Sequence, residues 1–414
     1  MRRHKAFCLV AMMIWSGGVA GAQALSRQRV TASLRALEPR LIAIRRDLHR
    51  HPELSGAERR TAERIADALR TAGVETRTGI GGFGVVGIVR GARPGPVVAY
   101  RADIDAFPSD ASDPVPFRST TPGVRHICGH DVHTAIGIGL ATAFARHRRQ
   151  LSGTLVFVFQ PAEERATGAH AMLDAGVFGD LAPVAIYGLH TAPLPVGEMA
   201  VTGGDMMSGY DDYRVTIRHA DASERQRIAT LVRDRISALG TITPDAIFAP
   251  TPPDFAVVPP PSIVDSGGIT IVSGRVTTTS LRRPALQREM QALDELSAGQ
   301  TTITTQYIPK VIAGVHNDDA LTRRASAAVA RTLGHDHVQP MPTIIPAFSE
   351  DFGAYQDRIP GVFFFLGVAN PPKGTVGMPH TPEYVADERA ILTGARAMAA
   401  VLLDRLSPST TSRP

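Results

Sequence analysis

The sequence predicts an α/β protein: a large domain with helices on both faces of a sheet, and a smaller α+β domain inserted into it. Two observations predict this architecture. Short apolar runs bounded by glycine and proline alternate with segments of helical periodicity over most of the chain. Residues 210–315 interrupt the alternation with a pattern of their own. The length of 414 residues and the hydrophobic content of 43% suit two globular domains.

Residues 1–24 have the features of a secretory signal peptide. A basic head is followed by ten apolar residues, 6–15, and then by small residues that offer an A-x-A-like cleavage site at Ala22 or Ala24. The apolar run is too short for a membrane span, and the alternative is an N-terminal anchor. We therefore expect an exported protein, periplasmic or secreted, with no membrane association after cleavage.

Removal of these residues changes the composition. Arg2, Arg3 and Lys5 are lost, so the formal net charge falls from +5 to +2, which gives no reason to expect nucleic-acid binding. Cys8 is also lost, and Cys128 becomes the single cysteine of the mature chain. A lone thiol in an oxidising compartment is either a buried filler or a working sulfur.

The large domain is assigned to residues 25–209 and 316–408. Apolar residues at helical spacing predict a first helix over residues 25–54, and a second follows over 58–72, ended by Gly73. The remaining predicted helices are 134–147, 168–175 and 388–406, and the predicted buried strands are 84–89, 96–100, 154–159, 184–188 and 362–366.

The inserted segment, residues 210–315, is called the lid below. Strand patterns at 212–217, 255–258, 269–279 and 301–312 enclose helical patterns at 224–239 and 284–296. The resulting order β-α-β-β-α-β is that of the ferredoxin-like motif.

Polar side chains follow several of the predicted strands. Asp103 comes after the strand at 96–100, Glu163 and Glu164 after 154–159, and His190 after 184–188. Ligands of open α/β sheets bind at the carboxyl edge of the strands, so we expect these groups to meet there. Two further groups are the turn 126–133 (HICGHDVH) and the segment MPHTP around His380, which follows the strand at 362–366.

These residue types suit a divalent metal site. Cys128 and His130, separated by one glycine, can face one ion from a turn, and a cation there would hold the cysteine as a thiolate. Glu164, His190 and His380 bring the number of candidate ligands to five, which suits two ions with a shared ligand. Zn, Mn, Co and Ni all accept such mixed S/N/O ligands. Glu163 is then free to act as the general base toward a bound water. Taken singly, each of these residues has a structural alternative, such as a core histidine, a solvated turn or a buried thiol.

The motifs resemble those of a known family. LHRHPELS, YRADIDAFP, HICGHDVHTA, GTLVFVFQPAEE, YGLH, SEDFGAY and MPHTPEY occur in order along the large domain. They are similar to the aminoacylase and carboxypeptidase-type metallopeptidases, in the branch of hippurate hydrolases, N-acetyl-diaminopimelate deacetylases and auxin–amino acid conjugate hydrolases. The resemblance implies an amidohydrolase that cleaves N-acyl amino acids or short peptides. The alternatives are a dipeptidase or carboxypeptidase on the same site, and a non-catalytic metal- or ligand-binding homologue.

Residue by residue, the resemblance implies two metal ions per subunit and Glu163 as the catalytic base. It implies that Asp103 and Asp131 orient ligands, that His133 packs or orients, and that Glu350 supports the site. The implied ligands are Cys128, His130, Glu164, His190 and His380.

The lid departs from the family pattern. Family members carry a Gly-Gly-His-Ala segment after the first lid strand, with a histidine thought to bind substrate, whereas this chain has Arg218-His219-Ala220. His219 is therefore either a shortened version of that segment or a surface residue. Arg275 is the candidate replacement for a family arginine, and the resemblance also implies a homodimer formed through the lid.

Overall fold

The computed structural model describes residues 25–246, 249–341 and 344–407. The predicted signal peptide, residues 1–24, lies outside the described residues. A sheet of eight strands organises the large domain, and its four middle strands, β6, β3, β7 and β17, pair in parallel. In spatial order the strands are β1 (Glu75–Ile80), β2 (Gly84–Arg90), β6 (Ser152–Gln160), β3 (Arg93–Asp103), β7 (Ile186–Pro195), β17 (Gly361–Ala369), β8 (Met199–Val201) and β16 (Val338–Pro340).

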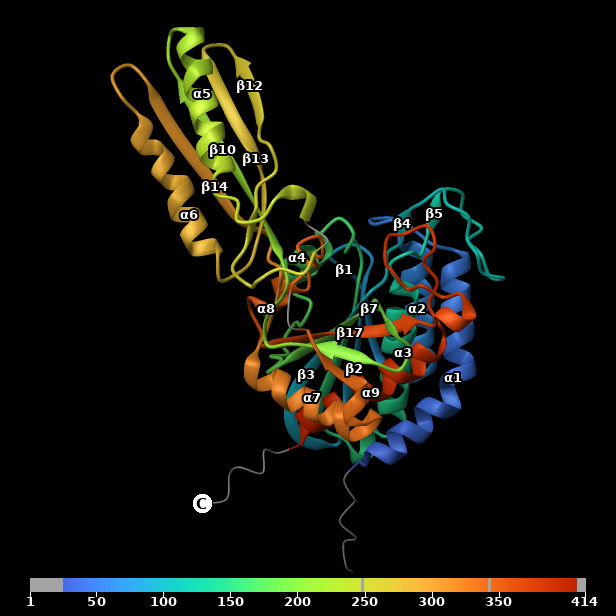
Figure 1. Ribbon diagram of the computed structural model, residues 1–414. Helices are drawn as coiled ribbons and strands as arrows, with labels where there is room; N and C mark the ends of the chain where they lie inside the picture. The colour runs from blue at the N-terminus through green and yellow to red at the C-terminus, as the bar shows by residue number, and fades with distance from the viewer. Residues whose placement is uncertain (1–24, 247–248, 342–343, 408–414) are drawn as a thin grey trace, which may run out of the picture.

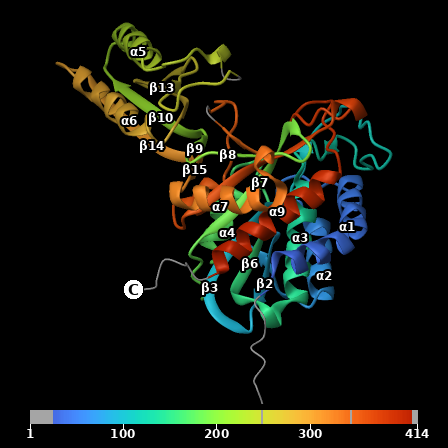
Figure 2. The same ribbon diagram turned by 60° about the horizontal axis from the view of Figure 1, so that its bottom comes forward.

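Helices cover both faces of this sheet, as predicted (Figures 1 and 2). Along β6, Leu155 and Phe157 face one core, while Val156 and Val158 face the other, because successive strand residues point to opposite sides. The first core is covered by α1 (Arg27–Arg50), α2 (Arg59–Thr71), α3 (His130–Arg146), α7 (Asp319–Leu333) and α9 (Arg389–Leu406). The short helices α4 (Gly168–Asp174) and α8 (Gly353–Gln356) contribute to the second.

The lid has a sheet and a core of its own and projects away from the large domain in Figure 1. The strand order is β11 and β12 along one edge of β13, then β10, then β14, which is the ferredoxin-like arrangement. Its elements are β10 (Gly209–Arg218), α5 (Ala222–Ser237), β11 (Ala256–Val257), β12 (Ser262–Ser266), β13 (Ile269–Thr278), α6 (Arg283–Gln291) and β14 (Thr302–Ile312).

Two small two-stranded ladders complete the framework. β9 (Gly204–Met207) pairs with β15 (Val315–Asn317) where the chain enters and leaves the lid. β4 (Phe107–Pro108) pairs with β5 (Val124–Arg125) beside the turn that leads into α3. None of the helices in the described part of the chain combines the length and the apolarity that a membrane span requires.

Candidate metal centre

The turn before α3 brings Cys128 and His130 to the carboxyl edge of the sheet. Gly129 between them has a φ of +95°, and a Cβ there would lie 2.3 Å from the hydroxyl of Tyr384 and 2.4 Å from that of Thr191. Only glycine suits both the backbone conformation and the space. The chain therefore turns sharply enough for Cys128 and His130 to face the same region.

Glu163 and Glu164 lie in the turn that follows β6. Ala162, with a φ of +53°, donates its N–H to Glu58 Oε1 at 2.8 Å, and Glu164 donates its N–H to Asp105 Oδ2 at 3.0 Å. Two buried carboxylates from elsewhere in the chain thus fix the backbone of the glutamate pair. The sequence does not reveal this role of Glu58 and Asp105, because only the folded chain shows which N–H groups they accept.

The structure brings the five predicted ligands together. Cys128 Sγ lies 3.1 Å from His190 Nε2 and 3.2 Å from His380 Nε2. His380 Nε2 lies 3.1 Å from Glu164 Oε2. His190 comes from β7, and His380 from the loop between β17 and α9. The five side chains are called the donor cluster below: Cys128, His130, Glu164, His190 and His380.

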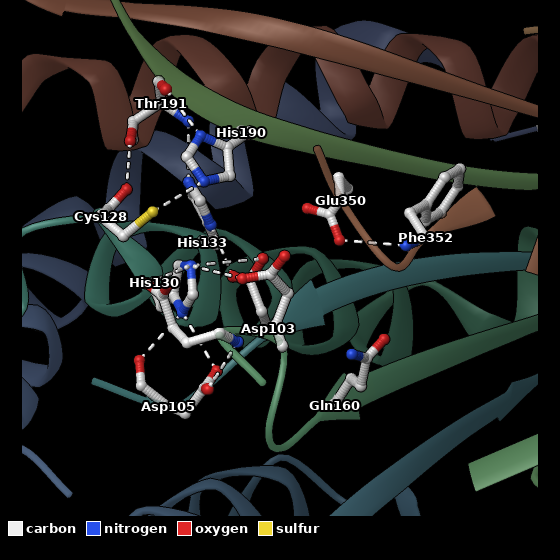
Figure 3. Close-up of polar contacts among 12 residues, drawn as sticks. Asp103, Asp105, Cys128, His130, His133, Gln160, His190, Thr191, Glu350 and Phe352 are labelled. Atoms are coloured by element: carbon white, nitrogen blue, oxygen red, sulfur yellow. Dashed lines mark hydrogen bonds and ion pairs between the residues drawn. The ribbon is translucent and has the colours of Figure 1, made fainter. Parts of the chain in front are cut away.

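His130 provides a test of whether a cation fits the donor cluster. Its Nδ1 faces the backbone carbonyl of Asp105 at 2.9 Å, so Nδ1 carries the proton and Nε2 faces the cluster (Figure 3). Nε2 is buried and has no hydrogen-bond partner among the described residues, although it lies 3.7 Å from Glu163 Oε2 and 3.9 Å from Glu164 Oε1. A buried imidazole nitrogen that faces carboxylates and forms no hydrogen bond to them is suited to bind a cation. The residues of the donor cluster are therefore suited to bind a divalent metal ion.

The electrostatics of the cluster also favour a cation. Burial alone would lower the pKa of His130, but Asp103 and Asp105 raise it to about 10. Burial, with Glu164 and Glu163 close by, raises the pKa of the Cys128 thiol well above its usual value. Without a metal ion, both side chains hold a proton at neutral pH, and binding of an ion displaces these protons.

Glu163 is placed to act on a molecule held by the cluster. Its side chain is 10% exposed, and its carboxylate faces His130 Nε2 at 3.7 Å. Burial, followed by the nearby charges of Glu350 and Glu164, raises the pKa of Glu163 well above its usual value. A carboxylate with a raised pKa is a stronger base than a solvated one.

Two of the predicted supporting residues, His133 and Asp131, form hydrogen bonds or ion pairs with residues outside the donor cluster. His133 accepts the N–H of Thr191 at Nε2 (2.9 Å) and bonds Asp103 through Nδ1 (2.6 Å), so both of its nitrogens are used (Figure 3). Asp131 bonds His49 at 2.8 Å and Arg45 at 2.7 Å. Among the predicted orienting carboxylates, Asp103 lies closest to the donors, 3.7 Å from His130 Nε2. The carboxylate and carbonyl that hold His130 belong to Asp105.

A buried arginine joins the predicted supporting residue Glu350 to the sheet. Arg101 is fully buried and its guanidinium contacts Glu350 Oε1 at 2.9 Å, Asp103 Oδ2 at 2.7 Å and Asp351 Oδ1 at 3.0 Å. Carboxylate oxygens of Glu163, Glu350 and Asp351 lie within 4.8 Å of one another. Arg101 thus offsets part of the negative charge that gathers behind Glu163.

The structure does not bring His219 to the donor cluster. It lies in the turn between β10 and α5, at the end of β10 remote from the β9–β15 ladder, and its Nδ1 accepts the N–H of Asp221 at 3.1 Å. Arg275, on β13, is bound to Asp212 at 2.7 Å. Within one subunit, neither residue faces the candidate ligands.

Comparison with known proteins decides the family. The sequence pattern of "Peptidase family M20/M25/M40" matches residues 99–404. The chain belongs to this family. It is 34% identical to N-acetylcysteine deacetylase of Bacillus subtilis over 393 residues, which are 88% of this chain and 96% of that protein. It is 29% identical to thermostable carboxypeptidase 1 of Saccharolobus solfataricus over 392 residues, which are 90% of this chain and 97% of that protein.

The crystal structure of the YXEP protein of Bacillus subtilis, described as a dinuclear metal binding peptidase from the M20 family, superposes with a TM-score of 0.73. The two sequences are 31% identical, and the match covers 90% of this chain and 99% of the other. These comparisons confirm the predicted family, the fold of a catalytic domain with an inserted lid, and the prediction of a metal-dependent hydrolase.

Proposed function

We propose that this M20 hydrolase cleaves the amide bond of N-acyl amino acids or short peptides at a site of two divalent ions held by the donor cluster. The observation that carries the proposal is the convergence of five donor side chains around Cys128 Sγ, with the buried carboxylate of Glu163 directly beside them. A site for metal binding alone has no use for this extra carboxylate, which argues against a non-catalytic homologue.

The chain's own residues supply the proton transfers. Two divalent ions, when bound, lower the pKa of a water molecule and polarise the amide carbonyl. Glu163 takes the proton of that water and delivers it to the nitrogen of the leaving amine. Behind Glu163, the Arg101 guanidinium binds the buried carboxylates of Glu350 and Asp351 and holds them in place.

The names of the relatives support two substrate classes. One relative is a deacetylase of an N-acyl amino acid, and another is a carboxypeptidase. Both reactions break an amide and differ in what occupies the acyl side. We propose the N-acyl amino acid as the principal substrate and the dipeptide or peptide as the alternative.

Several further properties are part of the proposal. The ions are Zn, Mn, Co or Ni, all of which accept sulfur, nitrogen and oxygen ligands. The basic and apolar N-terminal residues support export to the periplasm or the medium. A homodimer formed through the lid would allow His219, at the far end of β10, to serve the active site of a second subunit.

The experiment is a substrate panel. The mature chain, stripped of metal and reconstituted in turn with Zn, Mn, Co and Ni, is incubated with N-acetyl amino acids, N-benzoyl amino acids and dipeptides. We expect metal-dependent release of free amino acid, fastest from one N-acyl class. Faster cleavage of the dipeptides would favour the peptidase alternative. Two ions bound without turnover of any substrate in the panel would contradict the proposal.

A further inference from the structure

We infer that Phe107 positions the imidazole of His380 for metal binding by stacking on it. The other two histidines of the donor cluster are oriented by a hydrogen bond instead. This inference rests on the proposed role of His380 as a ligand. Phe107 belongs to β4, outside the donor cluster.

The other two histidines are oriented by backbone carbonyls. His130 Nδ1 bonds the carbonyl of Asp105 at 2.9 Å, and His190 Nδ1 bonds the carbonyl of Thr191 at 2.7 Å. A carbonyl oxygen only accepts, so in both rings Nδ1 carries a proton and Nε2 is the nitrogen left to bind an ion. Such contacts behind a ligand fix its tautomer and its orientation.

His380 lacks this support. In the described part of the chain, no side chain or carbonyl is bonded to its Nδ1. Its side chain is 44% exposed, whereas those of His130 and Glu164 are 0% and 7% exposed. Its φ of +60° is the left-handed region that a residue with a Cβ rarely adopts. His380 is thus the most loosely enclosed member of the donor cluster.

Phe107 supplies the missing contact. Its ring lies against that of His380 with centroids 4.3 Å apart and an interplanar angle of 29°. A stacked neighbouring ring restricts rotation of the imidazole about its side-chain bonds and leaves Nε2 facing Cys128 and Glu164. It does not fix the tautomer, so orientation is the property that the stack controls.

The β4–β5 ladder holds both partners of the stack. Phe107 pairs with Arg125 in this ladder, and the Arg125 guanidinium donates to the carbonyl of Pro382 at 3.1 Å. Two residues after Arg125, the carbonyl of Ile127 accepts the N–H of His380 at 2.8 Å. The loop that carries His380 is therefore fastened on both sides of the stacked ring to the segment that leads to Cys128.

The test measures metal release in the absence of substrate. Wild type and Phe107→Ala are loaded with two Co²⁺ ions, mixed with an excess of a chromogenic chelator, and followed through the cobalt absorption bands. We expect one of the two ions to leave Phe107→Ala about tenfold faster, the range found when a residue behind a ligand is removed. The other ion should leave at the wild-type rate, and Phe107→Tyr should restore slow release of both.

Two controls separate this effect from others. Phe83→Ala removes another half-buried phenylalanine, one that faces Arg59 rather than a ligand, and should release both ions at the wild-type rate. Wild-type release rates in Phe107→Ala, or equal acceleration of both ions in Phe107→Ala and Phe83→Ala, would overturn the inference. His380→Ala tests the proposed site itself: if it still retains both ions as tightly as wild type, His380 is not a ligand, and the ligand assignment fails whatever Phe107 does.

Discussion

Glu163 and Glu164 are neighbours in the chain, yet their carboxylates face different partners. Glu164 Oε2 lies 3.1 Å from His380 Nε2, and Glu163 Oε2 lies 3.7 Å from His130 Nε2. The difference arises from the turn at Ala162, which Glu58 and Asp105 hold through two backbone N–H groups. In the mechanism that we propose, Glu164 binds metal and Glu163 transfers protons.

Asp387 provides a prediction about pH that is independent of metal. Burial opposes its ionisation, but hydrogen bonds from Arg389 and Asn370 lower its pKa to about 2. The pKa of an aspartate in the unfolded chain is about 4, and its pKa in the folded protein is lower. Such a carboxylate stabilises the folded protein at pH values above about 4, and this stabilisation is lost as the pH falls toward 2. Because the Arg389 side chain is 57% exposed, solvent screening reduces the contribution to about 1 kcal/mol.

We therefore expect Asp387→Asn to unfold more easily than wild type at pH 7. The difference in the free energy of unfolding, measured in urea on metal-free protein, should remain constant down to about pH 5 and shrink between about pH 4 and pH 2. A difference that does not change with pH would show that the asparagine perturbs packing rather than charge.

The residue types of the donor cluster could be predicted from the sequence, because their chemistry is specific and they lie after predicted buried strands or in the turn before a predicted helix. The residues behind them could not. Asp105 and Glu58 accept backbone N–H groups 59 and 104 positions away in the chain, and Arg101 contacts Glu350 across 249 positions. No local pattern indicates these distant partners. His219 was selected only because Arg218-His219-Ala220 resembles a family motif. The fold places it after the end of β10 that is remote from the β9–β15 ladder.

At the scale of elements, the turn between β5 and α3 determines where the donors point. Gly129→Ala would force a Cβ against Tyr384 and Thr191 and strain a backbone with a φ of +95°. We expect a loss of about 1–3 kcal/mol in stability and a lower affinity for metal, measured by thermal unfolding and by metal content after dialysis. Gly176→Ala is the matched control, since it has a φ of +68° but nothing within 4 Å. Equal metal loss in both variants would show that the close fit at Gly129 is irrelevant.

Strands with a continuous burial pattern were predicted from the sequence. β2, β6 and β17 are almost continuously buried, and the sequence predicts each of them. β1 and β12 were missed because their residues are polar or mostly exposed and pair along one edge only. α7 was missed because its buried side consists mainly of alanine, which gives a weak periodic pattern.

At the scale of the whole molecule, the lid and the large domain have separate hydrophobic cores. Metal bound by the donor cluster stabilises only the domain that contains the cluster. We therefore expect two thermal transitions in calorimetry, of which metal raises only one. Val215→Ala, in the lid core, should destabilise the lid by about 2 kcal/mol and lower the temperature of the transition that does not respond to metal. Val158→Ala, in the large domain, should lower the temperature of the transition that responds to metal. A single transition that responds to all three changes would show that the two parts unfold as one unit.

The most direct test of the proposed mechanism compares two isosteric variants, Glu163→Gln and Glu164→Gln, for metal content and turnover on the same N-acyl amino acid. We expect Glu163→Gln to retain two ions per subunit and to lose roughly 10²–10⁴-fold in turnover, because only the general base is removed. Glu164→Gln should lose at least one ion together with its activity. The opposite result, with metal lost from Glu163→Gln and retained by Glu164→Gln, would contradict the assignment of base and ligand.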